Sequence, residues 1–181
     1  MNRALSISSL ILILFLMIFH CVQSANDIVQ DTCKKMATDV PDLNFDFCVK
    51  SLGSESESHE ADLEGLGLIG LKLLKANLTG TIEYIKQLMK QKPEPHLLEG
   101  LSLCLDVYDS LELKDLIPYY KAKRYDDVRS WVSSMMTSED TCDTQESSKR
   151  GMVPPLTKRN VDIFQLTAIG LGILAILLGR V

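Results

Sequence analysis

The sequence lacks the motifs that mark the common enzyme classes. It contains no GxSxG nucleophile elbow, no HExxH zinc motif and no phosphate-binding P-loop. Only three histidines are present, without a CxxC pair beside them, so a zinc site is not indicated. Acidic pairs such as Asp126-Asp127 are typical of a solvated helix face. We therefore predict a protein that is not an enzyme and has no catalytic residue, no metal and no cofactor.

Aromatic and basic residues are also scarce. Aromatic residues make up 6% of the chain, and 24 acidic residues outnumber 19 basic ones. Nucleic-acid-binding domains usually carry a basic surface, so this composition argues against that class of partner. A neutral or basic protein is the partner that the charge favours.

Charge is almost absent from the first 24 residues, where Arg3 is the only charged side chain. An apolar run over residues 10–19 follows, and then Val22-Gln23-Ser24. This pattern predicts a signal peptide over residues 1–24 and a secreted product. An uncleaved anchor is the alternative, but a membrane span needs about 20 apolar residues. Cleavage would remove one base and no acid, which changes the formal net charge from −5 to −6.

Cysteine is present but sparse. Cleavage would remove Cys21 and leave Cys33, Cys48, Cys104 and Cys142. In an oxidising compartment, four cysteines predict two disulfides. Three pairings are possible, and the simplest joins neighbours in sequence, Cys33 to Cys48 and Cys104 to Cys142.

No segment alternates convincingly between polar and apolar residues, so no sheet is expected. Apolar residues instead recur at helical spacing, which predicts helices over residues 26–37, 43–52, 59–91, 95 to Pro118, 125–136 and 157–178, with a serine-rich linker at 51–58 and a loop at 149–155. We predict an all-α fold, an up-and-down four-helix bundle over residues 54–181. Residues 25–53 would form an N-terminal helical hairpin.

The last predicted helix raises the question of a membrane anchor. Residues 163–178 are very apolar but number only 16, and they include Gln165 and Thr167. The residues before them do not fit the spacer of a glycolipid-anchor signal. We favour a buried bundle helix and expect no stable membrane anchor.

Two further segments are candidate surface sites. Asn77-Leu78-Thr79 is an N-glycosylation sequon, and Asn77 must face solvent if it carries a glycan. Residues 119–127 gather tyrosine, arginine and lysine, and tyrosine and arginine commonly anchor protein interfaces. The alternative is a solvated loop between helices, with Tyr125 capping the core.

Several segments, in a fixed order along the chain, carry a resemblance to a known family. They are Thr38-Asp39 upstream of Phe47-Cys48, Ala61-Asp62-Leu63-Glu-Gly-Leu66, Cys104-Leu-Asp-Val-Tyr108, Arg124-Tyr-Asp-Asp-Val128, Ser133-Ser-Met-Met-Thr137, Asp140-Thr-Cys142 and Pro155-Leu-Thr-Lys-Arg-Asn160. Together with the four cysteines, they resemble the plant invertase and pectin methylesterase inhibitor family. The resemblance implies a four-helix bundle with an N-terminal hairpin and the two local disulfides. It also implies a one-to-one complex that sterically blocks a carbohydrate enzyme without a cofactor.

The resemblance also suggests partner-binding residues. Invertase inhibitors of this type often carry Pro-Lys-Phe at the start of the third bundle helix, where this chain has Lys123-Arg124-Tyr125. In pectin methylesterase inhibitors, polar residues on the second and third bundle helices face the enzyme, and Asp106 and Thr141 match two of them. Two other acidic positions fall on Ser110 and Leu113.

From these matches, the partner-binding candidates are Asp106, Thr141, Arg124 and Tyr125. We favour pectin methylesterase as the target. The alternatives are acid invertase (beta-fructofuranosidase) and a non-inhibitory wall protein with the same fold. The expected location is the apoplast or cell wall, with the vacuole as the alternative.

Overall fold

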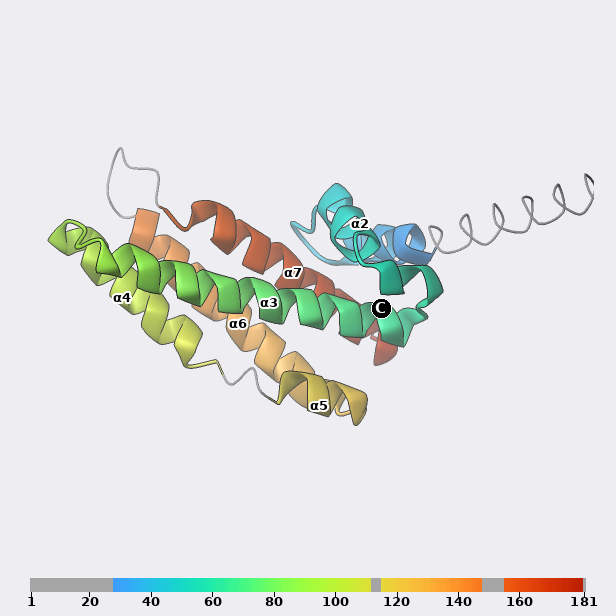
Figure 1. Ribbon diagram of the computed structural model, residues 1–181. Coiled ribbons are helices and arrows are strands. Elements are labelled where there is room, and N and C mark those ends of the chain that lie inside the picture. The colour runs from blue at the N-terminus through green and yellow to red at the C-terminus, as the bar shows by residue number, and fades with distance from the viewer. Residues whose placement is uncertain (1–27, 112–114, 148–154, 181) are drawn as a thin grey trace, which may run out of the picture.

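The computed structural model describes residues 28–111, 115–147 and 155–180. The predicted signal peptide and most of the predicted 149–155 loop lie outside these residues. Helices account for all the regular structure in the described ranges (Figure 1). In chain order they are residues 28–39, α2 (Phe45–Gly53), the 3₁₀ helix η1 (Ser56–Glu60), α3 (Leu63–Lys90), α4 (Pro95–Asp109), α5 (Leu116–Lys121), α6 (Tyr125–Ser147) and α7 (Thr157–Leu177).

Four long helices form the bundle. Helix α3 packs against α4 and α7, and α6 packs against the same two helices, so each helix touches its two neighbours around a closed ring. The short helix α5 packs against α3 and α6 at one end of the bundle (Figure 1). The predicted all-α bundle is therefore confirmed. Its core includes Leu74, Leu78 and Ile85 of α3, which are fully buried, and each such side chain contributes about 1.5–3 kcal/mol.

Helix boundaries differ from the prediction at three places. Helix α3 begins after Asp62, whose carboxylate accepts a hydrogen bond from the Gly65 amide at 2.8 Å, so residues 56–60 form a separate 3₁₀ turn instead of a linker. Helix α4 ends at Asp109, well before Pro118. Pro118 is the third residue of α5, where a missing backbone amide hydrogen costs little because first-turn amides have no partner within the helix.

The third difference is the length of α6. It continues to Ser147, well past the predicted end at residue 136, and it includes Cys142. The buried stripe runs on from Val132 and Met135 through Glu139 to Cys142 in steps of three and four. The prediction was wrong because Glu139 and its neighbours are polar, and this hid the helical periodicity.

Helix α7 lies in the bundle between α3 and α6. It is long and apolar enough to cross a membrane, but 61% of its most apolar stretch is buried inside the protein. The predicted buried bundle helix is thus confirmed. Its Gln165 has a structural role, since the side-chain oxygen accepts from the Asn44 amide and the side-chain nitrogen donates to the Asp42 carbonyl, both at 2.8 Å.

These two bonds fasten the N-terminal hairpin to the bundle. A disulfide between Cys33 and Cys48 closes the hairpin itself, with Cα atoms 5.8 Å apart. The hairpin also contacts α7 where Met36 packs against Gly172. Only glycine fits at this position, because a Cβ atom there would lie 2.6 Å from the sulfur of Met36. The hairpin is therefore held to α7 at its turn and along its first helix.

Candidate protein-binding site

A buried disulfide joins α4 to α6. Cys104 and Cys142 have Cα atoms 4.9 Å apart and are fully buried. Asn160 of α7 lies beside them; its side-chain nitrogen is 3.6 Å from the Cys142 sulfur, and its oxygen accepts from the Tyr108 hydroxyl at 3.0 Å. Because Asn160 is itself fully buried, this contact ties three helices together at one point and limits how far α4 and α6 can shift.

Asp106 and Thr141 are close in sequence to this disulfide, one on α4 and the other on α6. Asp106 follows Cys104 by two residues, Thr141 precedes Cys142 by one, and both are exposed. The Thr141 hydroxyl donates to the Thr137 carbonyl at 2.8 Å, which leaves its oxygen free to accept. Within the described residues, the Asp106 carboxylate has no ion pair or hydrogen bond to another side chain. We call these two residues and the exposed side of α4 around them the α4–α6 face.

The surface of α4 beside Asp106 is hollowed. A shallow depression of about 460 Å³ runs along the helix, lined by Leu98, Ser102, Leu103 and Asp106 among others. Leu98 is one of the few large apolar side chains left exposed, at 38%. An exposed leucine beside an acidic group gives this surface both apolar area and a directional acceptor.

The second candidate region is the turn between α5 and α6. Helix α5 ends in a Schellman motif, in which the Lys123 amide bonds the Tyr120 carbonyl at 2.9 Å and the Arg124 amide bonds the Tyr119 carbonyl at 3.0 Å. Lys123 has φ +58°, a conformation that glycine adopts more easily than lysine does. The side chain of Lys123 therefore lies at the residue of this turn where any side chain strains the backbone most.

Side chains of the turn are held by contacts within the protein. The Arg124 guanidinium lies 3.8 Å from the centre of the Tyr119 ring and bonds the Asp127 carboxylate at 2.7 Å. That hydrogen bond raises the pKa of Arg124. The Tyr119 ring in turn packs on Trp131 with centres 4.7 Å apart. Arg124 is thus exposed yet fixed in direction.

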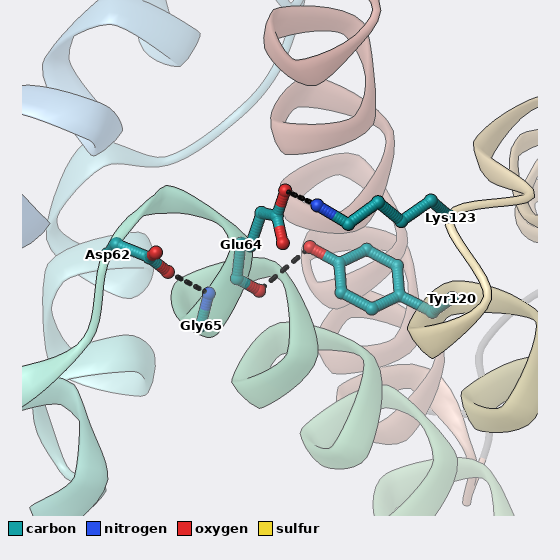
Figure 2. A network of polar contacts seen from close by, with 5 residues as sticks. All are labelled: Asp62, Glu64, Gly65, Tyr120 and Lys123. Atoms are coloured by element: carbon teal, nitrogen blue, oxygen red, sulfur yellow. Dashed lines mark hydrogen bonds and ion pairs between the residues drawn. The ribbon is translucent and has the colours of Figure 1, made fainter.

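Tyr120 and Lys123 connect the turn to the start of α3, as Figure 2 shows. The Tyr120 hydroxyl donates to the Glu64 carbonyl at 2.8 Å, and the Lys123 ammonium bonds the Glu64 carboxylate at 2.7 Å. Burial raises the pKa of the Tyr120 phenol. The bond to Glu64 raises the pKa of Lys123. Tyr125 packs on the Tyr120 ring, with centres 5.2 Å apart, so it caps the core in the way the alternative interpretation expected.

Gly67 leaves room for the Tyr120 hydroxyl beside α3, a role that the sequence did not reveal. A Cβ atom at Gly67 would lie 2.1 Å from the Tyr120 hydroxyl oxygen. Since the contact partner is 53 residues away, no local pattern could have identified it.

The four partner-binding candidates form two separate pairs. Tyr125 opens α6, and Thr141 lies 16 residues further along the same helix, about 24 Å away at 1.5 Å per residue. Asp106 and Thr141 lie on the two helices that the disulfide joins, whereas Arg124 and Tyr125 are consecutive residues at the turn. Among the described residues, no cluster of histidine, cysteine, aspartate and glutamate could hold a metal ion.

Comparisons with known proteins agree with the fold. A family model described as plant invertase/pectin methylesterase inhibitor matches residues 27–173. A relative from Platanus acerifolia named "Putative invertase inhibitor" is 39% identical over 164 residues, covering 90% of this chain and 91% of the relative. A relative from Arabidopsis thaliana named "Pectinesterase inhibitor 12" is 28% identical over 166 residues, covering 89% and 94%.

A solved structure shares the architecture. The crystal structure of a mutant form of a pectin methylesterase inhibitor from Arabidopsis has a TM-score of 0.67 and 22% identity, covering 78% of this chain and 91% of the other. At this identity the likeness shows the fold alone.

Proposed function

The chain belongs to the plant invertase/pectin methylesterase inhibitor family, and from this premise we propose that it inhibits pectin methylesterase by covering the substrate cleft with its α4–α6 face. The observation that carries the choice of face is Asp106, an exposed carboxylate that has no side-chain partner among the described residues. Such a carboxylate can bind a donor on a partner without first giving up a bond within the protein.

The proposed mechanism is steric and needs no reaction by the inhibitor. The disulfide and Asn160 hold α4 and α6 in place, so both helices can dock without rearrangement. Leu98 would supply apolar contact area, and Asp106 and Thr141 would fix the orientation. The complex is proposed to contain one copy of each protein.

Charge supports the encounter with a basic enzyme. The predicted secreted form carries a formal net charge of −6, and opposite net charges speed association at low salt. The proposed site of action is the cell wall, which the chain would reach through its predicted signal peptide. Inhibition that weakens as salt concentration rises would agree with this step.

A second candidate target is acid invertase. It is favoured by relatedness, because two Platanus relatives at 39% identity are named "Putative invertase inhibitor". The region involved would be the α5–α6 turn, where Lys123-Arg124-Tyr125 replaces the Pro-Lys-Phe often found in invertase inhibitors. In this chain the turn's charges already bond Glu64 and Asp127, so a partner would have to compete with these contacts.

Titration against both enzymes separates the candidates. Purified protein lacking residues 1–24 would be added to a plant pectin methylesterase and to an acid invertase, and residual activity measured against the molar ratio. Loss of pectin methylesterase activity that saturates at one equivalent, with invertase unaffected, is the expected result. Inhibition of invertase alone would assign the second target, and inhibition of neither would favour a non-inhibitory wall protein with this fold.

A further inference from the structure

A groove lies on the side of the bundle where the hairpin packs. It has a volume of about 570 Å³ and lies between α2, α3 and α7. Phe47, Leu73 and Leu166 supply apolar lining, whereas Lys50 and Asp162 supply hydrogen-bonding groups. A surface with an apolar wall and polar groups beside it suits a ligand that has both kinds of face.

Asn77 lines the same groove and is the first residue of the sequon. Its side chain is partly buried. The side-chain oxygen is buried without a hydrogen-bond partner in the described part of the chain, although such atoms are usually bonded. The side-chain nitrogen is the atom that a glycan would modify.

We propose that Asn77 carries an N-linked glycan whose first sugar lies in this groove and fastens α2 to α3 and α7. A pyranose ring has an apolar C–H face that can pack on Phe47, and hydroxyl groups within reach of polar side chains such as Lys50 and Asp162. In the attachment step, the Asn77 nitrogen bonds C1 of the sugar. The C1–oxygen bond to a lipid diphosphate donor breaks, and the amide proton leaves to a base of the transferring enzyme.

The position of Asn77 inside α3 does not oppose this step, because secreted chains receive such glycans before folding is complete. The inference depends on the predicted secretion and is independent of inhibition. The glycan would also lie away from the α4–α6 face, since α2 contacts α3, η1 and α7 but neither α4 nor α6.

Mass spectrometry tests the attachment. The full chain would be expressed in a plant cell that secretes it, next to Asn77→Gln, Thr79→Ala and the control Thr79→Ser, which keeps the sequon. Wild type and Thr79→Ser are expected to carry the mass of a glycan, which Asn77→Gln and Thr79→Ala lack. A wild-type chain without this mass would overturn the proposal.

Thermal unfolding tests whether the first sugar lies in the groove. The glycosylated chain would be compared with the same chain trimmed enzymatically to a single sugar, and with the sugar-free Asn77→Gln variant. The first two forms are expected to unfold at one temperature, about 2–4 °C above the third. Thr79→Ala, which lacks the sugar but keeps Asn77, should unfold at the same temperature as Asn77→Gln, so the result does not depend on one variant that folds poorly. Equal unfolding temperatures in all three forms would contradict the proposed position of the sugar in the groove.

Phe47→Ala, made with and without the glycan, locates the contact. The stabilisation by the glycan should disappear in this variant but persist in Phe45→Ala, since Phe45 is on the same helix, is 40% exposed and does not line the groove. If the glycan raised the unfolding temperature equally in both variants, the sugar would lie elsewhere.

Discussion

The α4–α6 face and the α5–α6 turn present polar side chains at opposite ends of one helix, but they are built differently. On the face, a buried disulfide fixes the backbone, and the exposed Asp106 has no side-chain partner among the described residues. At the turn, the exposed charges already have partners within the protein, since Lys123 bonds Glu64 and Arg124 bonds Asp127. Rigid backbone with free side chains suits recognition of a partner, whereas committed side chains suit stabilisation of the fold.

Removal of the disulfide between α4 and α6 should lower the stability of the protein more than any other change proposed here. Cys104→Ala with Cys142→Ala is expected to lower the free energy of unfolding by about 4 kcal/mol, measured by denaturant titration. Inhibition of pectin methylesterase should weaken as well, because α4 and α6 are then free to shift.

The matched control is removal of the hairpin disulfide through Cys33→Ala with Cys48→Ala. It closes a shorter loop, so its loss should cost about 3 kcal/mol, and it should leave inhibition by the folded protein unchanged. If both pairs weakened inhibition equally, the disulfide would not be what positions the face.

Gly67→Ala tests the turn. Its new methyl group would meet the Tyr120 hydroxyl, and relief of the clash should cost about 1–3 kcal/mol of unfolding free energy. The control is Gly80→Ala in the same helix, where space is open; this change should stabilise the protein by about 0.5–1 kcal/mol. Pectin methylesterase inhibition should survive both changes, and its loss in Gly67→Ala would show that the turn takes part.

Lys123→Gly is expected to have the smallest effect. Glycine removes the backbone strain at φ +58° but also the exposed ion pair with Glu64, so the two effects oppose each other and the unfolding temperature should rise slightly. Lys121→Gly serves as the control, because it puts glycine at the last residue of helix α5, which has a helical conformation, and should lower the unfolding temperature. A clear loss of stability in Lys123→Gly would mean that the ion pair outweighs the strain.

The sequence predicted most of the fold because local patterns carried it. Apolar spacing identified the bundle helices. It failed where a local pattern was misleading or absent. The polar stretch around Glu139 hid the second half of α6, and the Asp62 cap set a start for α3 that periodicity did not show.

Site residues were harder to predict because their roles arise between distant segments. Gln165 was noted as a polar exception in an apolar helix, but only the structure shows that it holds Asp42 and Asn44 across more than 120 residues. Gly67 and Tyr120 likewise meet only in the folded chain. The disulfide joins the helices that carry Asp106 and Thr141, whereas the role of these two residues in binding stays a prediction.

Binding to pectin methylesterase, measured by calorimetry for Asp106→Asn and Arg124→Ala beside the wild type, separates the two regions directly. If the α4–α6 face binds the enzyme, Asp106→Asn should raise the dissociation constant about tenfold, because the bond to the enzyme loses its negative charge, while Arg124→Ala should stay within about twofold of the wild type. The reverse order, a large loss for Arg124→Ala and none for Asp106→Asn, would contradict the proposed interface.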